Sequence, residues 1–310
     1  MRTKEILSIR SLSLLCCLFL AGCAQGGFSM KSLGSGILSS TGVVSGSQAD
    51  ALFEAGEKIA KAASPLSDEQ EYYLGRGVSA MVFAQYRPYR NAAVNQYVNR
   101  VGAVVAAVSD KPETFNGYHF QVLDTEEVNA ISAPGGFVFV TKGFLRLMKN
   151  EDTLASVLAH EVAHINYGHG VSAISQANLT EALLILGKEA AASQAGAELG
   201  ALTSAFGDSV TDVFNTLLTK GYSRSQEYES DEYAALLLKK AGYTPGSLQV
   251  MLTSLEQASK GSEESGWYST HPSPSRRISN LPEFATAQDP AAQGLEVRTA
   301  RFRKALASLS

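Results

Sequence analysis

Two histidines and a glutamate stand close together in the stretch VLAHEVAHINYGHG at 157–170. His160 and His164 are four residues apart, which on a helix places both on one face about one turn apart, so their imidazoles can converge on one ion. Glu161 is displaced by about 100° around that helix. A carboxylate there can take a proton from a metal-activated water, so the H-E-x-x-H pattern predicts a hydrolytic zinc site. The alternative is a chance match on an ordinary amphipathic helix.

A catalytic zinc takes a third protein ligand and keeps one position open. His169 is near, but the pattern H-E-x-x-H-x-x-G-x-x-H requires glycine at position 167 and histidine at position 170. The sequence has Tyr167 and Gly170 there, so His169 misses the register by one residue. On a continuing helix it would point about 140° away from His164. We expect His169 to be a helix-end histidine and not a ligand.

A second stretch, SRSQEYESDEYAA at 223–235, offers ligands from farther along the chain. Glu227 and Asp231 are four residues apart and share one face of a predicted helix. This spacing allows Glu227 to bind zinc while Asp231 accepts a hydrogen bond from the far nitrogen of a ligand histidine. Taken alone, the stretch is better explained as an acidic, solvated face, because Glu229 and Glu232 lie beside it.

Most elements that must position these residues are predicted to be helices. Ser67 to Gln70 forms an N-cap box, and apolar spacing predicts helices near 50–63 and over 67–86, 91–108, 153–168 (capped by Asp152 or Thr153), 225–241, 247–257 and 295–307. The alanine-rich stretch 173–218 is expected to be mostly helical but too charged to span a membrane. A period of two predicts strands at 118–124, 129–133 and 136–141. Residues 260–275 are expected to form a loop. The fold class is α+β and mainly α-helical.

The N-terminus has the pattern of a targeting segment. Basic residues precede the short apolar run SLSLLCCLFL, which ends in L-A-G-C at Cys23. This tetrapeptide resembles a bacterial lipobox, so we expect Cys23 to be lipidated; a plain secretory signal cleaved near Ala24 is the alternative. By resemblance to lipoproteins, Ala24 favours the outer membrane. All 3 cysteines lie in this region, so no disulfide is expected in the mature protein.

The composition and net charge limit the kind of protein that this chain can be. Hydrophobic residues make up 45% and charged residues 18% of 310 residues, which allows a sizeable core. The net charge is −4 and no basic patch stands out, so nucleic acid is not an expected partner. We divide the chain into a signal peptide at 1–22, a Gly/Ser-rich tether at 23–48, a folded domain at 49–285 and a C-terminal helix at 286–310.

Together, these segments resemble the gluzincin metallopeptidases, and in detail the HtpX and CAAX-prenyl-protease family (metallopeptidase family forty-eight). HEVAH and the later E-x-x-x-D are the motifs that resemble the gluzincins. The similar segments are LSDEQEYYLGR at 66–76, NAISAPGGFVFV at 129–140, YSRSQEYESDEYA at 222–234 and THPSPSRRI at 270–278. Membrane-integral family members have spanning helices, which we do not expect after the signal here, so the chain resembles a soluble, lipid-tethered branch. Ser230 stands where the family often has alanine.

The resemblance implies a zincin-like metalloprotease domain, with a small mixed β-sheet packed beside the HExxH helix and one Zn²⁺ per chain. The implied ligands are His160, His164 and Glu227, with Glu161 as general base and Asp231 behind a ligand histidine. The implied activity is a zinc endopeptidase of the bacterial cell envelope, lipid-anchored at the periplasmic face of the outer membrane and cleaving misfolded envelope polypeptides. The alternatives are a non-catalytic or latent lipoprotein that uses the fold for binding, and a hydrolase of non-peptide amides.

Two further features concern the substrate. The tetrahedral oxyanion needs a donor, for which His271 is the first candidate and Arg224, Tyr228 and Tyr268 are alternatives. His271 could instead cover the zinc in a resting state, or belong to a simple His-Pro turn. An extended substrate could pair by strand addition along Asn129, Ala130, Ile131, Ser132 and Ala133. The alternative is that these residues only form one strand of a β-hairpin. The two interpretations do not exclude each other.

Overall fold

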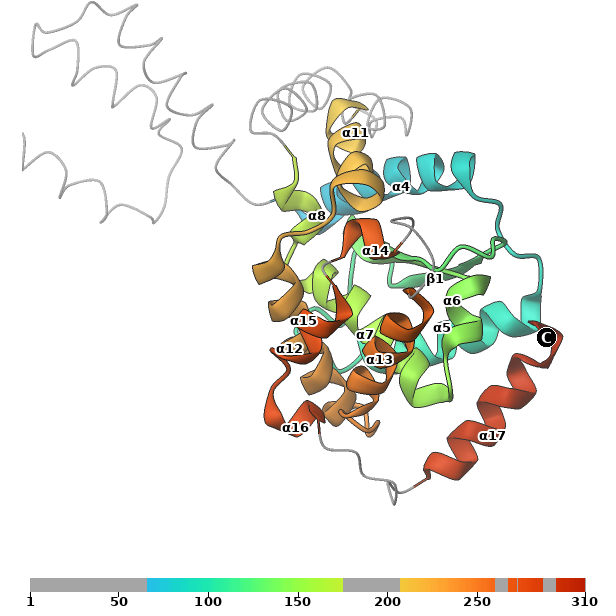
Figure 1. The fold of residues 1–310 in the computed structure, drawn as a ribbon. Coiled ribbons are helices and arrows are strands. Elements are labelled where there is room, and N and C mark those ends of the chain that lie inside the picture. Colours follow the sequence, from blue (N-terminus) through green and yellow to red (C-terminus); the bar gives the residue numbers. More distant parts are fainter. Residues whose placement is uncertain (1–65, 175–206, 260–266, 272, 287–293, 310) are drawn as a thin grey trace, which may run out of the picture. The chain divides into compact units, whose positions relative to one another are not determined.

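The computed structural model describes residues 66–174, 207–259, 267–271, 273–286 and 294–309. All of them belong to one compact unit, Lys61–Ser310 (Figure 1). The predicted signal peptide, tether, Cys23 and the helix near 50–63 lie outside the described residues, as does most of 173–218. The proposed domain boundaries therefore stay predictions.

Three strands form a small mixed sheet with the order β1-β3-β2. β3 (Phe137–Thr141) pairs in parallel with β1 (His119–Leu123) and antiparallel with β2 (Ala130–Ala133). The turn between β2 and β3 is the short 3-10 helix η2 (Pro134–Gly136). It contains Gly135 with φ 74°, where a Cβ atom would lie 2.5 Å from the Cα atom of Tyr72. Only glycine fits this turn, because α4 (Asp68–Gln85) packs directly against it.

The remaining described elements are helical, which confirms the mainly α-helical α+β class. They are α5 (Ala92–Ala106), α6 (Lys142–Leu147), α7 (Glu151–Asn166), α8 (His169–Ser172), α11 (Gly207–Asn215), η3 (Thr216–Lys220), α12 (Arg224–Lys240), α13 (Ser247–Ser259), α14 (Trp267–Thr270), α15 (Pro274–Ile278), α16 (Glu283–Thr286), α17 (Leu295–Ala305) and η4 (Ala307–Leu309). Among the helices of the described part, none is long and apolar enough to cross a membrane.

The helix starts follow local capping chemistry. Ser67 caps α4 in a reciprocal capping box with Gln70, as predicted. The cap of α7 is Asn150, and the prediction of Asp152 or Thr153 was wrong: the side chain of Asn150 accepts from the amide of Thr153, whose side chain in turn accepts from the backbone of Asn150. Helix α6 was not predicted, and α14 and the start of α15 lie in the stretch that was predicted to be a loop.

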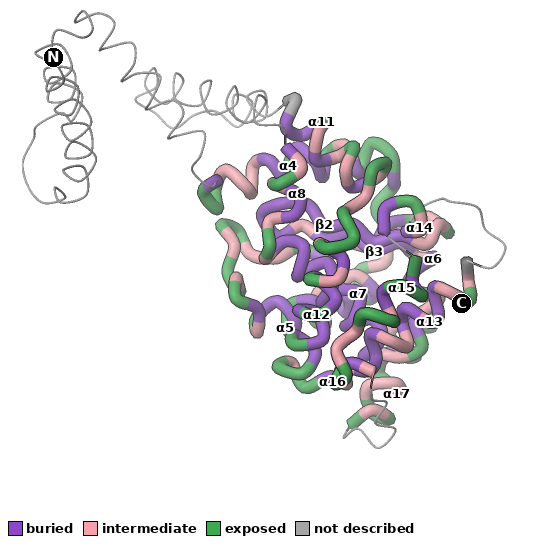
Figure 2. Tube along the Cα trace, turned by 60° about the vertical axis from the view of Figure 1, so that its left-hand side comes forward, coloured by how far each residue is buried: buried purple, intermediate pink, exposed green. Residues whose placement is uncertain are grey.

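Helix α7 is buried along its length, from Glu151 to Ile165 (Figure 2). It packs against α5, α12, α13 and strand β2, and its apolar side chains belong to the main hydrophobic core. A helix with this environment can carry polar residues only if each of them has a partner.

Two carboxylates in the first turn of α7 connect it to the C-terminal helix. Glu151 is 1% exposed and accepts hydrogen bonds from the hydroxyls of Tyr97 at 2.7 Å and Tyr243 at 3.1 Å, besides an ion pair with Arg301. Asp152, also 1% exposed, accepts from Arg298 Nε at 2.6 Å. Both arginines belong to α17, so these ion pairs fix that helix against the core.

We predict that Asp152→Ala lowers the free energy of unfolding by about 3 kcal/mol, because it leaves Arg298 without its buried partner. Urea denaturation of the purified protein measures the change. Glu296→Ala removes an exposed carboxylate of the same α17 helix and should change stability by less than about 0.5 kcal/mol. Equal effects of the two substitutions would contradict the anchoring role of Asp152.

Candidate metal centre

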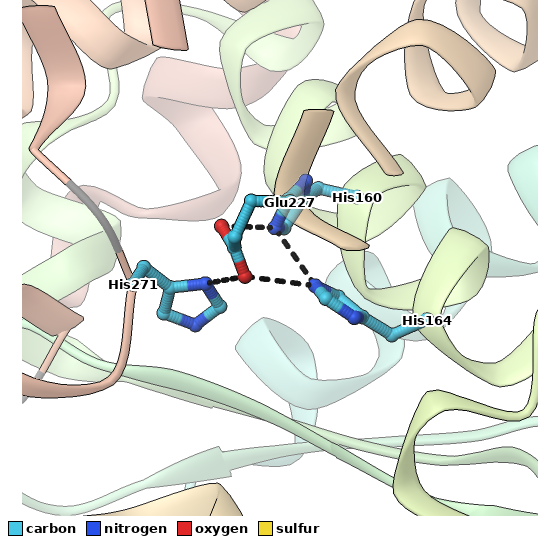
Figure 3. Close-up of side chains that lie close together, drawn as sticks. All are labelled: His160, His164, Glu227 and His271. Atoms are coloured by element: carbon cyan, nitrogen blue, oxygen red, sulfur yellow. Dashed lines mark hydrogen bonds and ion pairs between the residues drawn. The ribbon is translucent and has the colours of Figure 1, made fainter. Parts of the chain in front are cut away.

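Four buried side chains meet beside α7 (Figure 3). One ligand atom from each of His160, His164, Glu227 and His271 lies within 4.8 Å of all the others. The two histidines come from α7, Glu227 comes from α12, and His271 directly follows α14. The structure thus brings together the residues that the sequence singled out as ligands, and it adds His271 to them.

The distances show a common focus. His160 Nε2 and His164 Nε2 are 3.1 Å apart. The carboxylate of Glu227 lies beside both, with Oε2 3.6 Å from His160 Nε2 and Oε1 3.4 Å from His164 Nε2. His271 approaches from the other side, its Nδ1 2.8 Å from Glu227 Oε1. Three imidazoles and one carboxylate therefore surround a single point.

Behind His160 lies a buried ion pair. Asp231 Oδ1 is 3.1 Å from His160 Nδ1. The guanidinium of Arg277 donates to both oxygens of Asp231, at 2.8 Å from Nε and 2.6 Å from Nη2, and its Nη1 is 3.1 Å from Glu227 Oε2. Because a carboxylate only accepts, we place the proton of His160 on Nδ1, which leaves the lone pair of Nε2 directed into the cluster.

Arg277, which is fully buried, was not singled out from the sequence. Arg224, the arginine considered there as an oxyanion donor, is exposed. The available signal was the R-I ending of the segment at 270–278. Its arginine lies 46 residues from Asp231, and no helical periodicity joins two residues at that separation.

His169 supports His164 from outside the cluster. Helix α7 ends before Gly168, whose φ of 64° turns the chain and brings His169 back toward the helix. The Nδ1 atoms of His164 and His169 are 2.9 Å apart, and His169 Nε2 is 3.4 Å from Glu229 Oε2. His169 is absent from the group of described residues that could hold a metal. The direction away from His164 was expected only for a continuing helix, and α7 ends at Asn166.

Tyr222 is a second neighbour that the sequence analysis missed. Its ring stacks on His164 at a centroid distance of 4.1 Å and an angle of 17°. Its hydroxyl is buried without a hydrogen-bond partner among the described residues. Burial, followed by the negative charges of Glu161 and Glu227, raises the pKa of Tyr222 well above its ordinary value. A neutral phenol therefore lies beside the two carboxylates.

The electrostatics suit metal binding at His164 and Glu227 and require the loss of a proton at His160. Burial and the charge of Arg277 oppose the protonation of His160, but its hydrogen bonds to Asp231 and Glu227 outweigh them and raise its pKa to about 9, so a bound metal would displace a proton there. Burial lowers the pKa of His164 well below its usual value, so its imidazole is neutral. Burial opposes the ionisation of Glu227, but the charges of His271 and Arg277 outweigh it and hold the pKa of this carboxyl well below its ordinary range. A neutral imidazole and an ionised carboxylate are the protonation states that a metal requires of its ligands.

A divalent cation fits this site. Glu161 is 1% exposed, and its Oε1 has no hydrogen-bond partner among the described residues. With its histidines neutral, as metal binding requires, the site holds the three carboxylates of Glu161, Glu227 and Asp231 and the one guanidinium of Arg277. These leave two formal negative charges in a buried place, which a dication would neutralise. Imidazole nitrogens with one carboxylate oxygen form a usual ligand set for zinc.

The other predicted residues lie as follows. Tyr268 donates its hydroxyl to Leu255 O at 2.8 Å, so this group is already engaged. The ring of His271 stacks on Trp267 at 3.7 Å. Residues Asn129, Ala130, Ile131, Ser132 and Ala133 are all buried, none of them more than 3% exposed.

Comparison with known proteins decides the family. The sequence model of Peptidase family M48 matches residues 92–285, more than half of the chain. The chain belongs to this family. The predicted metallopeptidase family is thus confirmed, whereas kinship with HtpX and the CAAX proteases within it stays a prediction.

Individual relatives carry protease names. The chain is 25% identical to the beta-barrel assembly-enhancing protease of Escherichia coli over 74% of its own length and 46% of the relative's. It is 30% identical to the mitochondrial metalloendopeptidase OMA1 of Schizosaccharomyces pombe over 61% of this chain and 52% of that one. It is 25% identical to metalloprotease LoiP of Escherichia coli over 63% of this chain and 73% of LoiP. The chain spans about half the length of the first two relatives.

The contact between His164 and His169 yields a prediction. We expect His169→Ala to weaken zinc binding about tenfold, because the Nδ1 atom of His164 loses the partner that orients its ring. Competition with a chromophoric chelator measures the affinity. His119→Ala, which removes an exposed histidine of β1, should bind zinc like the unmodified protein. Unchanged affinity in His169→Ala would contradict this role.

Proposed function

We propose that this protein is a zinc-dependent endopeptidase. The observation that carries the proposal is the buried convergence of His160, His164 and Glu227 beside a Glu161 carboxylate with an unpartnered oxygen. Membership of Peptidase family M48 and the protease names of its relatives support peptide-bond hydrolysis over hydrolysis of other amides.

Zinc bound here would supply a Lewis acid that polarises the scissile carbonyl and lowers the pKa of a water molecule. Glu161 would accept the proton of the attacking water and deliver it to the leaving amine. Its buried position excludes competing solvent, and its neighbours on α7 are the ligand histidines. Asp231 would hold His160 in the tautomer that presents Nε2, and Arg277 would keep Asp231 ionised.

Glu161→Gln tests this function. We expect casein cleavage to be abolished while one zinc ion per chain remains bound, because the amide cannot accept the proton but leaves the ligands in place. Metal analysis of the purified protein and a casein assay give the two readouts. Glu232→Gln, a matched change at an exposed position of α12, should cleave like the unmodified protein. Unchanged cleavage by Glu161→Gln would refute the mechanism, and loss of zinc from this variant would contradict the role of Glu161 as a base that does not hold the metal.

Of the two roles considered for His271, we favour the cover of a resting site. A catalytic zinc keeps one position open to water, whereas His271 directs Nδ1 at the same carboxylate oxygen of Glu227 that faces His164. Its ring is also held by the stacked Trp267. In this arrangement the protein would be latent until the segment carrying His271 moves outward.

His271→Ala separates the two roles. We expect faster casein cleavage, because the fourth position becomes free for water, together with zinc affinity about tenfold weaker because a ligand is lost. Rates and affinity are measured on the same preparation, with His119→Ala as the matched histidine control. A fall in kcat/KM of about 100-fold with unchanged zinc affinity would instead identify His271 as the oxyanion donor.

We retain strand β2 as the proposed site of substrate pairing. One edge of β2 is bonded to β3, and η3 packs against this strand. Because β2 is buried, an extended substrate could pair with it only after η3 moves away. Backbone pairing would then supply affinity that does not depend on the substrate sequence.

For the biological setting, we propose a lipid-anchored enzyme of the bacterial cell envelope. The lipobox-like L-A-G-C at Cys23 supports the anchor, and the E. coli relative named a beta-barrel assembly-enhancing protease supports an envelope role. We propose the periplasmic face of the outer membrane as its location and misfolded envelope polypeptides as its substrates.

A further inference from the structure

A cleft of about 490 Å³ opens on the candidate metal centre, and every residue that lines it carries a hydrogen-bond donor group in its side chain, of which the Tyr268 hydroxyl is already engaged by Leu255 O. We call it the donor cleft; it is lined by Lys220, Tyr222, Ser223, Arg224, Tyr268, Ser269, Thr270, His271, Ser273 and Arg276. Its described lining contains no carboxylate and no aliphatic side chain. Such a composition suits an anion better than an apolar side chain.

The positive charge of the cleft is available to a ligand. Lys220, Arg224 and Arg276 are exposed, and among the described residues none of the three makes an ion pair. The chain as a whole carries a net charge of −4. Three unpaired cations around one cleft therefore form a local positive field on an acidic protein.

The cleft is continuous with the candidate metal centre. Tyr222 lines the cleft and stacks on His164, while His271 lines it and contacts Glu227 at 2.8 Å. The amide of Tyr222 donates to Thr270 O at 3.1 Å, which joins the two walls. One short extended peptide can therefore place one of its groups in the cleft and another at the candidate metal centre.

We infer that the donor cleft selects polypeptides with a carboxylate close to the scissile bond. This inference rests on the proposed peptidase function and specifies its substrate class. The carboxylate could be an aspartate or glutamate side chain or the carboxyl terminus of the substrate, since both are recognised by the same guanidinium and hydroxyl donors.

Peptide binding to zinc-loaded Glu161→Gln protein tests the inference without requiring turnover. Pairs of fluorescent peptides that carry glutamate or glutamine at one position are compared by anisotropy, with the position scanned along the peptide. We expect the glutamate peptide to bind roughly tenfold tighter at one position, the effect of one charge-assisted hydrogen bond. A second pair, ending in a free carboxylate or a carboxamide, distinguishes a terminal carboxylate from a side chain.

Matched substitutions locate the effect. Arg224→Gln with Arg276→Gln should reduce the glutamate-to-glutamine preference to about one, because the donors of the cleft are removed. The control pair Arg90→Gln with Arg303→Gln removes the same charge at exposed positions outside the cleft and should retain the preference.

Several results would overturn the inference. The first is equal affinity for the glutamate and glutamine peptides at every position. The second is a loss of the glutamate preference in the control pair as large as in the Arg224 and Arg276 variant. The third is binding to phosphatidylglycerol vesicles that requires Arg224 and Arg276 while the peptides show no preference. Absence of casein cleavage by both the unmodified protein and the His271→Ala variant would refute the peptidase function instead, and the two failures are therefore distinguishable.

Discussion

The guanidinium of Arg277 has no contact with solvent, and the candidate metal centre depends on the carboxylates that hold it. Asp231 accepts two of its hydrogen bonds, and Glu227 lies 3.1 Å from its remaining nitrogen. A buried charge without partners would cost several kcal/mol. The helices α12 and α15 must therefore approach each other in one register, and this register also directs Asp231 at His160 on α7. One ion pair thus sets the positions of three helices and the tautomer of a proposed ligand.

Helix α7 combines stability and chemistry in one buried element. At its N-terminus, Glu151 and Asp152 are partnered by tyrosines and arginines, and their negative charges also suit the positive end of the helix dipole. Between two and three turns later, His160 and Glu161 are equally buried. There the partners come from α12 and α15, and one carboxylate oxygen of Glu161 has none among the described residues. This difference marks the second half of the helix as the functional part.

The arrangement of the centre also separates an inner side from an outer side. Asp231 and Arg277 lie on the inner side and are fully or almost fully buried. His271 and Tyr222 lie on the outer side, where they line the donor cleft. A change at the inner side alters how the ligands are held, whereas a change at the outer side alters what reaches them. The proposed latency and the proposed substrate preference both belong to the outer side.

Much of the architecture followed from local patterns. The capping box at Ser67, the helical spacing of α5, α7, α12 and α13, and the strand–PGG–strand unit depend on residues that are close in the sequence, where steric and hydrogen-bonding preferences act directly. Helix α6 escaped prediction because it is only six residues long (Lys142–Leu147), too short for a clear period. The cap at Asn150 was missed because several polar residues compete at that position.

By itself, the sequence determined that His160, Glu161 and His164 share a helix and that Glu227 and Asp231 share another, since helical geometry relates residues four apart. Only the tertiary structure decided which distant groups complete the site. It brought His169 back onto His164 through the turn at Gly168, paired Arg277 with Asp231, and gathered separate cations into one cleft. These contacts join segments separated by turns or by many residues, and their geometry follows from the packing of whole helices, which no local period encodes.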